Sequence, residues 1–318
     1  MRLLKLLPLA LTVLPSVLGV SLGVTPRPLV LWHGMGDSHA SRAMVEFGEL
    51  IAKVHPGIFI YSVYIEEDQE QDRRASFYGN VNEQVEFAAE QIANVTELQD
   101  GFDAIGFSQA GQFLRTYVER YNMPPVHNLI TFGSQHMGIS DIPACKPWDL
   151  VCQAARRAAK SSVYSHWAQT NLVQAQYYRD PDRLEAYLAN NKFLADINNE
   201  IPDTHNATYA KNFATLNKLV LVLFSKDITV VPKESAWFGS YAPSDETIPG
   251  ETTIIPMRMQ EIYIHDTIGL KRLDEEGDVI FKTCEGVHMQ LTEDCWRPLV
   301  KEFVGGAVRK TPSFRIQI

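Results

Sequence analysis

The sequence predicts an α/β fold in which helices cover both faces of a mainly parallel sheet. Two observations predict it. Short apolar runs alternate with amphipathic stretches of helical period, which is typical of βα units, and the apolar runs are continuous, as in strands buried on both faces. With 318 residues, of which 45% are hydrophobic, the chain is long enough to enclose such a core.

The first part of the chain shows the clearest alternation. Its expected strands are apolar, β-branched or aromatic runs, at residues 29–32, 58–65, 102–107 and 129–132. The helices expected between them have their apolar residues on one face, and they cover residues 43–54, 81–93 and 112–121. The third of these helices ends before Pro124.

The alternation stops between about residue 139 and residue 217, where the pattern is helical and interrupted by prolines. We interpret this segment as a helical insertion over the carboxyl edge of the sheet, within a single domain of residues 24–318. Further on, the sequence predicts a strand over 219–224, a turn at 274–277 between two short strands, and a last helix over 293–304.

Residues 1–23 have the features of a secretory signal peptide. Basic residues precede an apolar stretch, and Gly19 and Gly23 offer two cleavage points. The alternative is a membrane anchor, but two prolines interrupt the run and it is short for a membrane span. No later segment approaches the length needed to cross a bilayer, so we expect no transmembrane anchor in the mature protein.

Two glycosylation motifs agree with export: Asn94 and Asn206 each begin an N-glycosylation triplet.

The net charge of the chain bears on its partners. The formal charge is 29 − 38 = −9, and an acidic chain without a basic block is a poor binder of polyanions. We therefore expect no nucleic-acid partner.

The chain has four cysteines, none of them in a CxxC pair. In an oxidising compartment, Cys145 with Cys152 and Cys284 with Cys295 could form two disulfides. Close spacing suggests this pairing without proving it, and free buried cysteines are the alternative.

The most informative stretch is Gly106-Phe-Ser108-Gln-Ala110. A predicted strand runs into it and a predicted helix follows, which is the arrangement of a nucleophile elbow with serine at its apex. Small residues are needed around the serine because the sharp turn brings backbone and Cβ atoms close together. Alanine occupies the place of the usual last glycine. A serine that only caps the following helix is the alternative reading.

A serine nucleophile needs a histidine base and a carboxylate that orients it, in the chain order Ser, Asp, His for this fold. Asp227 follows the predicted strand 219–224, and His288 follows another strand and precedes the last helix. Each alone could be structural, as a turn acid or a loop histidine. Ser108, Asp227 and His288 together at three strand ends predict catalysis, and we expect His265 to be a structural or surface histidine.

The oxyanion of acyl transfer needs two hydrogen-bond donors. The elbow supplies the backbone N–H of Gln109, and the glycine-rich loop after the first strand supplies that of Met35. This loop is not a dinucleotide fingerprint, because His39 stands where the third glycine is due. Asp37 could belong to the site or simply cap a turn.

With these residues, the chain resembles the palmitoyl-protein thioesterases, which are lysosomal α/β-hydrolases that remove long acyl chains from cysteine thioesters. The matching segments include non-catalytic ones: LWHGMGDS at 31–38, GFSQAGQFL at 106–114, FLADIN at 193–198, ESAWFG at 234–239 and EGVHMQL at 285–291. By resemblance, Ser108 is the nucleophile, Asp227 the orienting acid and His288 the base, with the amides of Met35 and Gln109 as oxyanion donors. Ala110 departs from the family pattern.

The resemblance also implies the α/β-hydrolase fold, an acyl groove lined by the insertion, and no cofactor or metal. The groove candidates are Trp167, Leu172, Val173, Tyr177, Tyr178, Leu184 and Tyr187, and for each single residue the favoured alternative is an ordinary place in the core of the insertion. The implied substrates are S-palmitoylated proteins or peptides, with acyl-CoA as a further candidate, and the implied location is the lysosome or vacuole, or outside the cell. His39-Ala40 stands where family members can carry cysteines.

Two other functions fit the same residues. A secreted lipase or carboxylesterase would use the same triad on oxoesters. A catalytically silent acyl-binding protein could keep the hydrolase scaffold, although the complete Ser, Asp and His set argues against it.

Overall fold

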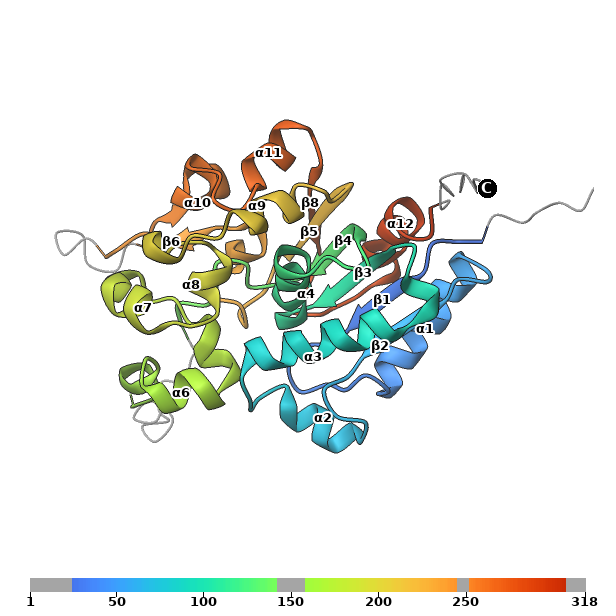
Figure 1. The fold of residues 1–318 in the computed structure, drawn as a ribbon, viewed down its shortest axis with the longest axis horizontal. Coiled ribbons are helices and arrows are strands. Elements are labelled where there is room, and N and C mark those ends of the chain that lie inside the picture. The colour runs from blue at the N-terminus through green and yellow to red at the C-terminus, as the bar shows by residue number, and fades with distance from the viewer. Residues whose placement is uncertain (1–24, 142–157, 245–251, 307–318) are drawn as a thin grey trace, which may run out of the picture.

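The computed structural model describes residues 25–141, 158–244 and 252–306, and a six-stranded sheet lies at its centre (Figure 1). The strand order is β2-β1-β3-β4-β5-β8, and every neighbouring pair is parallel. The strands are β1 (Leu29–Trp32), β2 (Ile60–Val63), β3 (Phe102–Phe107), β4 (Val126–Phe132), β5 (Lys218–Phe224) and β8 (Val279–Cys284). The predicted mainly parallel α/β fold is therefore confirmed.

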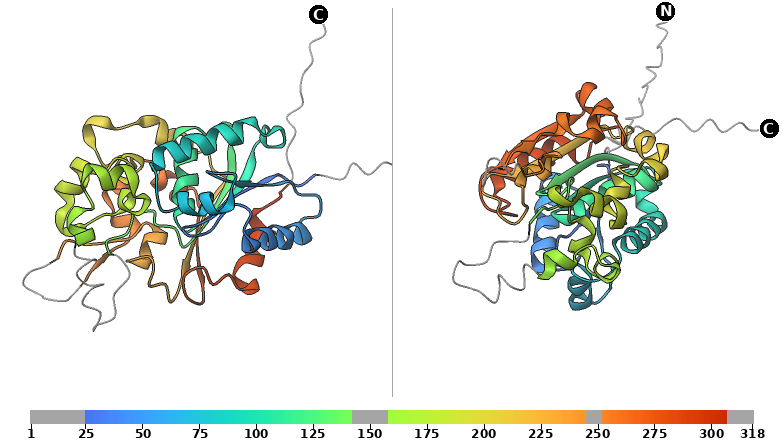
Figure 2. Two further views of the ribbon diagram at one scale, coloured as in Figure 1. Left: turned by 90° about the horizontal axis from the view of Figure 1, so that it is seen from below. Right: turned by 90° about the vertical axis from the view of Figure 1, so that its left-hand side faces the viewer.

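Helices cover both faces of this sheet, as the left view of Figure 2 shows. On one face, α1 (Arg42–Val54) and α12 (Glu293–Phe303) pack against alternate strand residues such as Leu29 and Leu31. On the other face, α3 (Val81–Asn94) and α4 (Gln109–Arg120) pack against the residues between them, such as Val30 and Trp32. Burial of both faces explains why the strands are continuous apolar runs.

The described part of the insertion is helical, as the sequence predicts. It contains α6 (His166–Asn171), α7 (Leu184–Asn190), α8 (Leu194–Ile197) and α9 (Ala207–Phe213). Its aromatic and aliphatic side chains join the core cluster that includes α4. As a result α4 is buried nearly all round, including Arg115 and Glu119, which have no exposed surface.

The structure corrects one element of the sequence prediction. Residues 274–277 are not a turn between two strands, because α11 (Leu270–Glu275) precedes β8. Leu270 and Leu273 are buried on one side of α11, and Gly277 follows the helix with φ +77°. These two leucines therefore belong to a short helix, and the glycine that follows it has the left-handed conformation common after helix ends.

Several further elements were not expected from the sequence. A short α10 (Glu261–Ile264) and a two-stranded antiparallel sheet of β6 (Ser240–Tyr241) and β7 (Ile254–Ile255) follow β5. The helix α2 (Gln69–Ala75) lies between β2 and α3. None of the helices among the described residues is long and apolar enough to cross a membrane.

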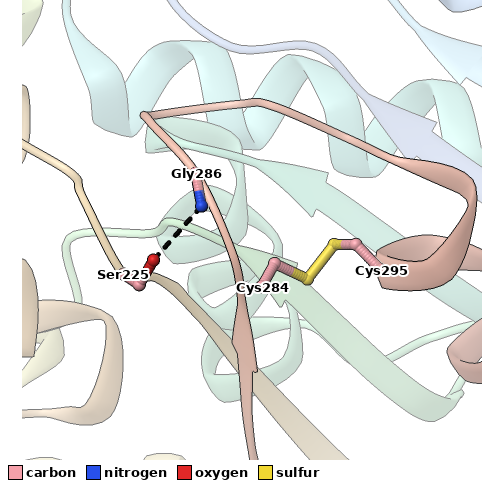
Figure 3. Close-up of a disulfide and its surroundings, with 4 residues drawn as sticks. All are labelled: Ser225, Cys284, Gly286 and Cys295. Carbon is pink, nitrogen blue, oxygen red and sulfur yellow. Dashed lines mark hydrogen bonds between the residues drawn. A yellow bond between two sulfur atoms is a disulfide. The ribbon is translucent and has the colours of Figure 1, made fainter.

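One of the two expected disulfides is present and confirmed. Cys284 at the end of β8 is bonded to Cys295 in the first turn of α12 (Figure 3). Cys145 and Cys152, like the predicted signal peptide, lie outside the described residues.

Candidate active site

Ser108, Asp227 and His288 lie at the same edge of the sheet because each follows the carboxyl end of a parallel strand. Ser108 follows β3, Asp227 follows β5 and His288 follows β8. β4 lies between β3 and β5, and β5 is paired with β8, so the three loops are close in space. Catalytic groups of open α/β sheets gather at this edge.

The three side chains form a continuous hydrogen-bonded file. Nε2 of His288 lies 3.0 Å from Oγ of Ser108, and Nδ1 of His288 lies 2.6 Å from Oδ2 of Asp227. The other carboxylate oxygen of Asp227 accepts hydrogen bonds from the backbone N–H groups of Thr229 (2.8 Å) and Val230 (3.0 Å). Because the carboxylate can only accept, it favours the imidazole tautomer with a proton on Nδ1, and Nε2 is then free to accept the serine proton.

The serine stands on a strained turn. Ser108 has φ 52° and ψ −124°, a conformation that side-chain-bearing residues rarely adopt and that marks functional sites. A Cβ on Gly106 would lie 2.5 Å from Cα of Gly111, and a Cβ on Gly111 would lie 1.9 Å from Oγ of Ser134. The tight positions are therefore 106 and 111, whereas Ala110 is accommodated within the core.

The loop that carries His288 is held from two sides. Beneath the imidazole, a Cβ on Gly133 would lie 3.1 Å from Cε1 of His288, closer than an ordinary van der Waals contact, and Gly133 has φ +59°. The pairing of β5 with β8 continues beyond the strands, and the N–H of Gly286 donates to Oγ of Ser225 (3.2 Å; Figure 3). The Cys284–Cys295 disulfide closes the same loop at its base.

The glycine-rich loop after β1 lies against the elbow. A Cβ on Gly34 would lie 3.2 Å from Cβ of Ser108. The N–H of Asp37 donates to the carbonyl of Gly34 (3.3 Å), and Gly36 has φ +80°, as the third position of a type II turn requires. The N–H of Met35 takes no part in the bond that closes this turn, and the N–H of Gln109 is the first of α4. Both amides thus flank Ser108 without helical or turn partners.

Two functional-site residues had no signal in the sequence. Nε2 of Gln135, in the loop after β4, donates to Oγ of Ser108 (3.1 Å), and this side chain is buried. Asp72 of α2 is fully buried, and its carboxylate accepts from the N–H of His39 (2.8 Å) and lies 3.1 Å from Nε2 of His33. The rule that site residues follow strand ends would have pointed to the loop of Gln135, but to none of its residues in particular.

The state of Asp72 follows from its surroundings. Burial by itself would raise the pKa of the Asp72 carboxyl, but the facing His33 imidazole and the backbone N–H groups of His39 and Ile65 hold that pKa well below its usual range. Asp72 is therefore a buried carboxylate that holds both ends of the loop between His33 and His39.

A pocket of about 310 Å³ opens beside the serine and the histidine. Its apolar walls come from α1 and from the loops after β1, β3 and β8, and they include Met44, Phe47, Phe107, Met289 and Leu291. The described insertion residues expected to line an acyl groove do not line this pocket. Tyr177, Tyr178 and Tyr187 are buried in the core, and Trp167 is exposed.

The remaining site predictions concern the surface. His265 is exposed at the end of α10, where Nε2 lies 3.0 Å from Oε2 of Glu261, so the expectation of a surface histidine is confirmed. Asn94 and Asn206 are both exposed, and their glycosylation stays a prediction. Within residues 25–141, 158–244 and 252–306, no group of three or more His, Cys, Asp or Glu side chains could hold a metal ion.

Comparison with known sequences identifies the relatives of this chain. The sequence profile described as palmitoyl protein thioesterase matches residues 28–288. The chain belongs to the palmitoyl-protein thioesterase family. The matched region of this thioesterase runs from the strand before the glycine-rich loop to His288, so it contains all three residues of the hydrogen-bonded file.

The alignments with similar proteins cover most of this thioesterase and most of each similar protein. A palmitoyl-protein thioesterase 1 of Caenorhabditis elegans is 40% identical over 83% of this chain and 87% of its own. A palmitoyl-protein thioesterase 3 of Dictyostelium discoideum is 32% identical over 92% of this chain and 95% of its own. Among solved structures, a lipase-esterase related protein of Clostridium acetobutylicum has a TM-score of 0.43 at 13% identity, over 87% of this chain and 93% of its own.

Proposed function

We propose that this thioesterase releases palmitate and similar long fatty acids from the S-acylated cysteines of proteins or peptides, through an acyl-serine intermediate. One observation carries the proposal: Ser108, His288 and Asp227 form a hydrogen-bonded file with distances of 3.0 Å and 2.6 Å. Membership of the palmitoyl-protein thioesterase family supports the thioester as the bond that is cleaved.

In the acylation step, Oγ of Ser108 attacks the thioester carbonyl carbon while Nε2 of His288 takes the hydroxyl proton. The Asp227 carboxylate stabilises the resulting imidazolium through Nδ1. The N–H groups of Met35 and Gln109 donate to the carbonyl oxygen as it becomes an oxyanion, and each such donor contributes about 3–4 kcal/mol to lowering the barrier. The C–S bond then breaks, His288 returns its proton to the sulfur, and acyl-Ser108 remains.

In the deacylation step, His288 removes a proton from water, and the hydroxide attacks the acyl-serine carbonyl. The fatty acid leaves and Oγ of Ser108 recovers the proton from His288. Gln135 donates to the same Oγ at 3.1 Å, and this bond directs the serine hydrogen toward His288. The base and the nucleophile are thus held in line before substrate binds.

The chemistry of the substrate fits the site. A thiol has a pKa of about 8.5, so a thiolate leaves readily and the site needs few contacts on the peptide side. The apolar chain supplies the affinity, at about 0.8 kcal/mol per buried CH₂ group. Acyl-CoA is also a thioester, so it is a second proposed substrate. The lysosome or a vacuole is the proposed location, with secretion as the alternative, because related proteins of Drosophila melanogaster and Bos taurus are named lysosomal thioesterases.

Palmitate release from a palmitoylated peptide tests the proposal. We expect activity in the wild type and a loss of at least about 10³-fold in Ser108→Ala and in His288→Ala. His265→Ala is the matched control and should keep wild-type activity, because His265 lies on the surface beside Glu261. Undiminished activity in Ser108→Ala, or faster hydrolysis of the matched oxoester than of the thioester, would contradict the proposal.

A further inference from the structure

Ser76, the residue that follows α2, is joined to both segments that carry the proposed oxyanion donors. Its side chain is buried, and its Oγ accepts a hydrogen bond from the N–H of Gly36 (2.8 Å) and donates to the carbonyl of Arg73 (2.6 Å). The second bond is an ordinary link within a helix end. The first bond reaches across to the glycine-rich loop and has no role in capping α2.

The backbone carbonyl of Ser76 reaches the other segment. It accepts a hydrogen bond from Nε2 of Gln109 (2.9 Å), the first residue of α4, and another from Nε2 of Gln174 (3.1 Å) in the insertion. The remaining side-chain oxygen of Gln109 accepts from the hydroxyl of Tyr177 (3.0 Å). One residue thus links the glycine-rich loop, the elbow and the insertion.

The position of this residue matters because two oxyanion donors must point at one oxygen. The N–H of Met35 and the N–H of Gln109 belong to separate segments, and a displacement of about 1 Å in such a constellation can cost 10²-fold in rate. The bond from Gly36 fixes the peptide that directly follows Met35. Asp72 in the same helix holds the N–H of His39 (2.8 Å), so α2 contacts the loop at its middle and at its end.

We propose that Ser76 is a positioning residue that sets the distance between the two oxyanion donors. It acts through its hydroxyl on the Gly34–Asp37 turn and through its carbonyl on Gln109. Because this role concerns the oxyanion, the inference rests on the proposed acyl-transfer function. Its consequence is specific: loss of the hydroxyl lowers transition-state stabilisation and leaves ground-state binding of the acyl chain unchanged.

Ser76→Ala, Ser76→Cys and Ser76→Thr test the inference. We expect kcat to fall by about 10- to 100-fold in Ser76→Ala with KM within about twofold of the wild type, because the loop loses one anchor and no wall of the pocket changes. Ser76→Cys keeps the shape with a weaker acceptor and should show a smaller loss, and Ser76→Thr should restore kcat. Ser240→Ala removes another buried hydroxyl, which accepts from Gln260, and serves as the control.

A transition-state analogue separates positioning from a general loss of structure. Palmityl trifluoromethyl ketone forms a tetrahedral adduct with a serine nucleophile, whereas palmitate binds as the product. Ser76→Ala should weaken binding of the ketone in proportion to its loss of kcat and leave palmitate binding unchanged. Equal weakening of both ligands, or a kcat within twofold of the wild type in Ser76→Ala and Ser76→Cys, would overturn the inference.

Failure of the proposed function gives a different result. In that case the wild type releases no palmitate from the peptide, whatever stands at position 76. The comparison of ketone with palmitate binding by calorimetry does not require thioester turnover, and it then decides the role of Ser76 alone.

Discussion

The side-chain amide of Gln135 lies 3.1 Å from Oγ of Ser108, on a different strand end from those of Asp227 and His288. The loop after β4 thus contributes to the site, and the serine hydroxyl contacts polar side chains from two strand ends, Gln135 after β4 and His288 after β8.

Gln135→Leu should lower kcat by about 2- to 13-fold, which corresponds to the loss of one hydrogen bond of about 0.5–1.5 kcal/mol. Without the amide, the serine hydroxyl can rotate away from His288. Steady-state kinetics on a palmitoyl thioester measure the effect. Gln91→Leu removes a partly buried amide away from the site, which bonds to Tyr61 and Tyr64, and should leave kcat unchanged. Equal kcat in Gln135→Leu and the wild type would exclude the role given to Gln135.

Asp227→Asn should lower kcat by about 10⁴-fold with little change in stability. The backbone amides of Thr229 and Val230 require an oxygen at the position of Oδ1. The new NH₂ group must therefore face Nδ1 of His288, which then becomes an acceptor, and the proton moves to Nε2. A protonated Nε2 cannot take the serine proton. Thermal unfolding beside the kinetics checks that the fold is retained, and near-normal kcat would contradict the assigned tautomer.

Replacing both Cys284 and Cys295 by alanine should lower the free energy of unfolding by about 2–3 kcal/mol, as expected for a bond that closes a loop with a sequence separation of 11. Activity should fall as well, because this loop carries His288. Denaturant unfolding and palmitate release measure the two effects. The interpretation fails if the double variant keeps the activity of the wild type at temperatures where both are folded.

Gly111→Ala should abolish folding or activity, whereas Ala110→Gly should keep the activity. A Cβ at position 111 would lie 1.9 Å from Oγ of Ser134 and 2.8 Å from Cβ of Thr131, both of which are in the core. Ala110→Gly should cost only about 1 kcal/mol of stability, as for any glycine in a helix. Soluble expression, melting temperature and kcat distinguish the two variants, and an active Gly111→Ala enzyme would contradict the close contact.

Glu119 should make the stability of the protein depend on pH. Burial raises the pKa of its carboxyl to about 8, although Arg115 and Arg120 oppose the shift. An unfolded Glu has a pKa of about 4.3, so the folded state keeps a proton that the unfolded state loses. The stabilisation of the folded state that results from this proton is fully present below about pH 4.3 and disappears as the pH rises through about 8.

Glu119→Gln should therefore remove part of the fall in melting temperature between pH 5 and pH 8. Glu302→Gln, at an exposed position, is the matched control and should follow the wild type. Calorimetry at several pH values measures the difference. Parallel changes in the melting temperatures of Glu119→Gln and the wild type from pH 5 to pH 8 would contradict the raised pKa of Glu119.

The sheet and the meeting of Ser108, Asp227 and His288 could be predicted from the sequence for a physical reason. Strands buried on both faces leave apolar runs, and in a parallel sheet the ends of those runs meet at one edge. Ser108, Asp227 and His288 are each next to such an end, so the predicted order of residues implied their meeting. The strained turn at Ser108 was predictable in the same way, because the glycine at 106 reports close backbone contact.

The remaining site residues left no such trace. Gln135, Asp72 and Ser76 act through single hydrogen bonds between loops, and a single polar residue in a loop has no period that a pattern could reveal. The helix at 270–275 was missed because two apolar residues before a glycine are also typical of a short strand and turn. In both cases the tertiary contacts decide the outcome, and they are not local in the sequence.

The separation of 180 positions between Ser108 and His288 has a consequence for this enzyme during its synthesis and folding. His288 follows an edge strand that comes late in the chain, so we expect Ser108 to be unreactive in a nascent or partly folded polypeptide. By the same argument, the first turnover requires that β8 has paired with β5.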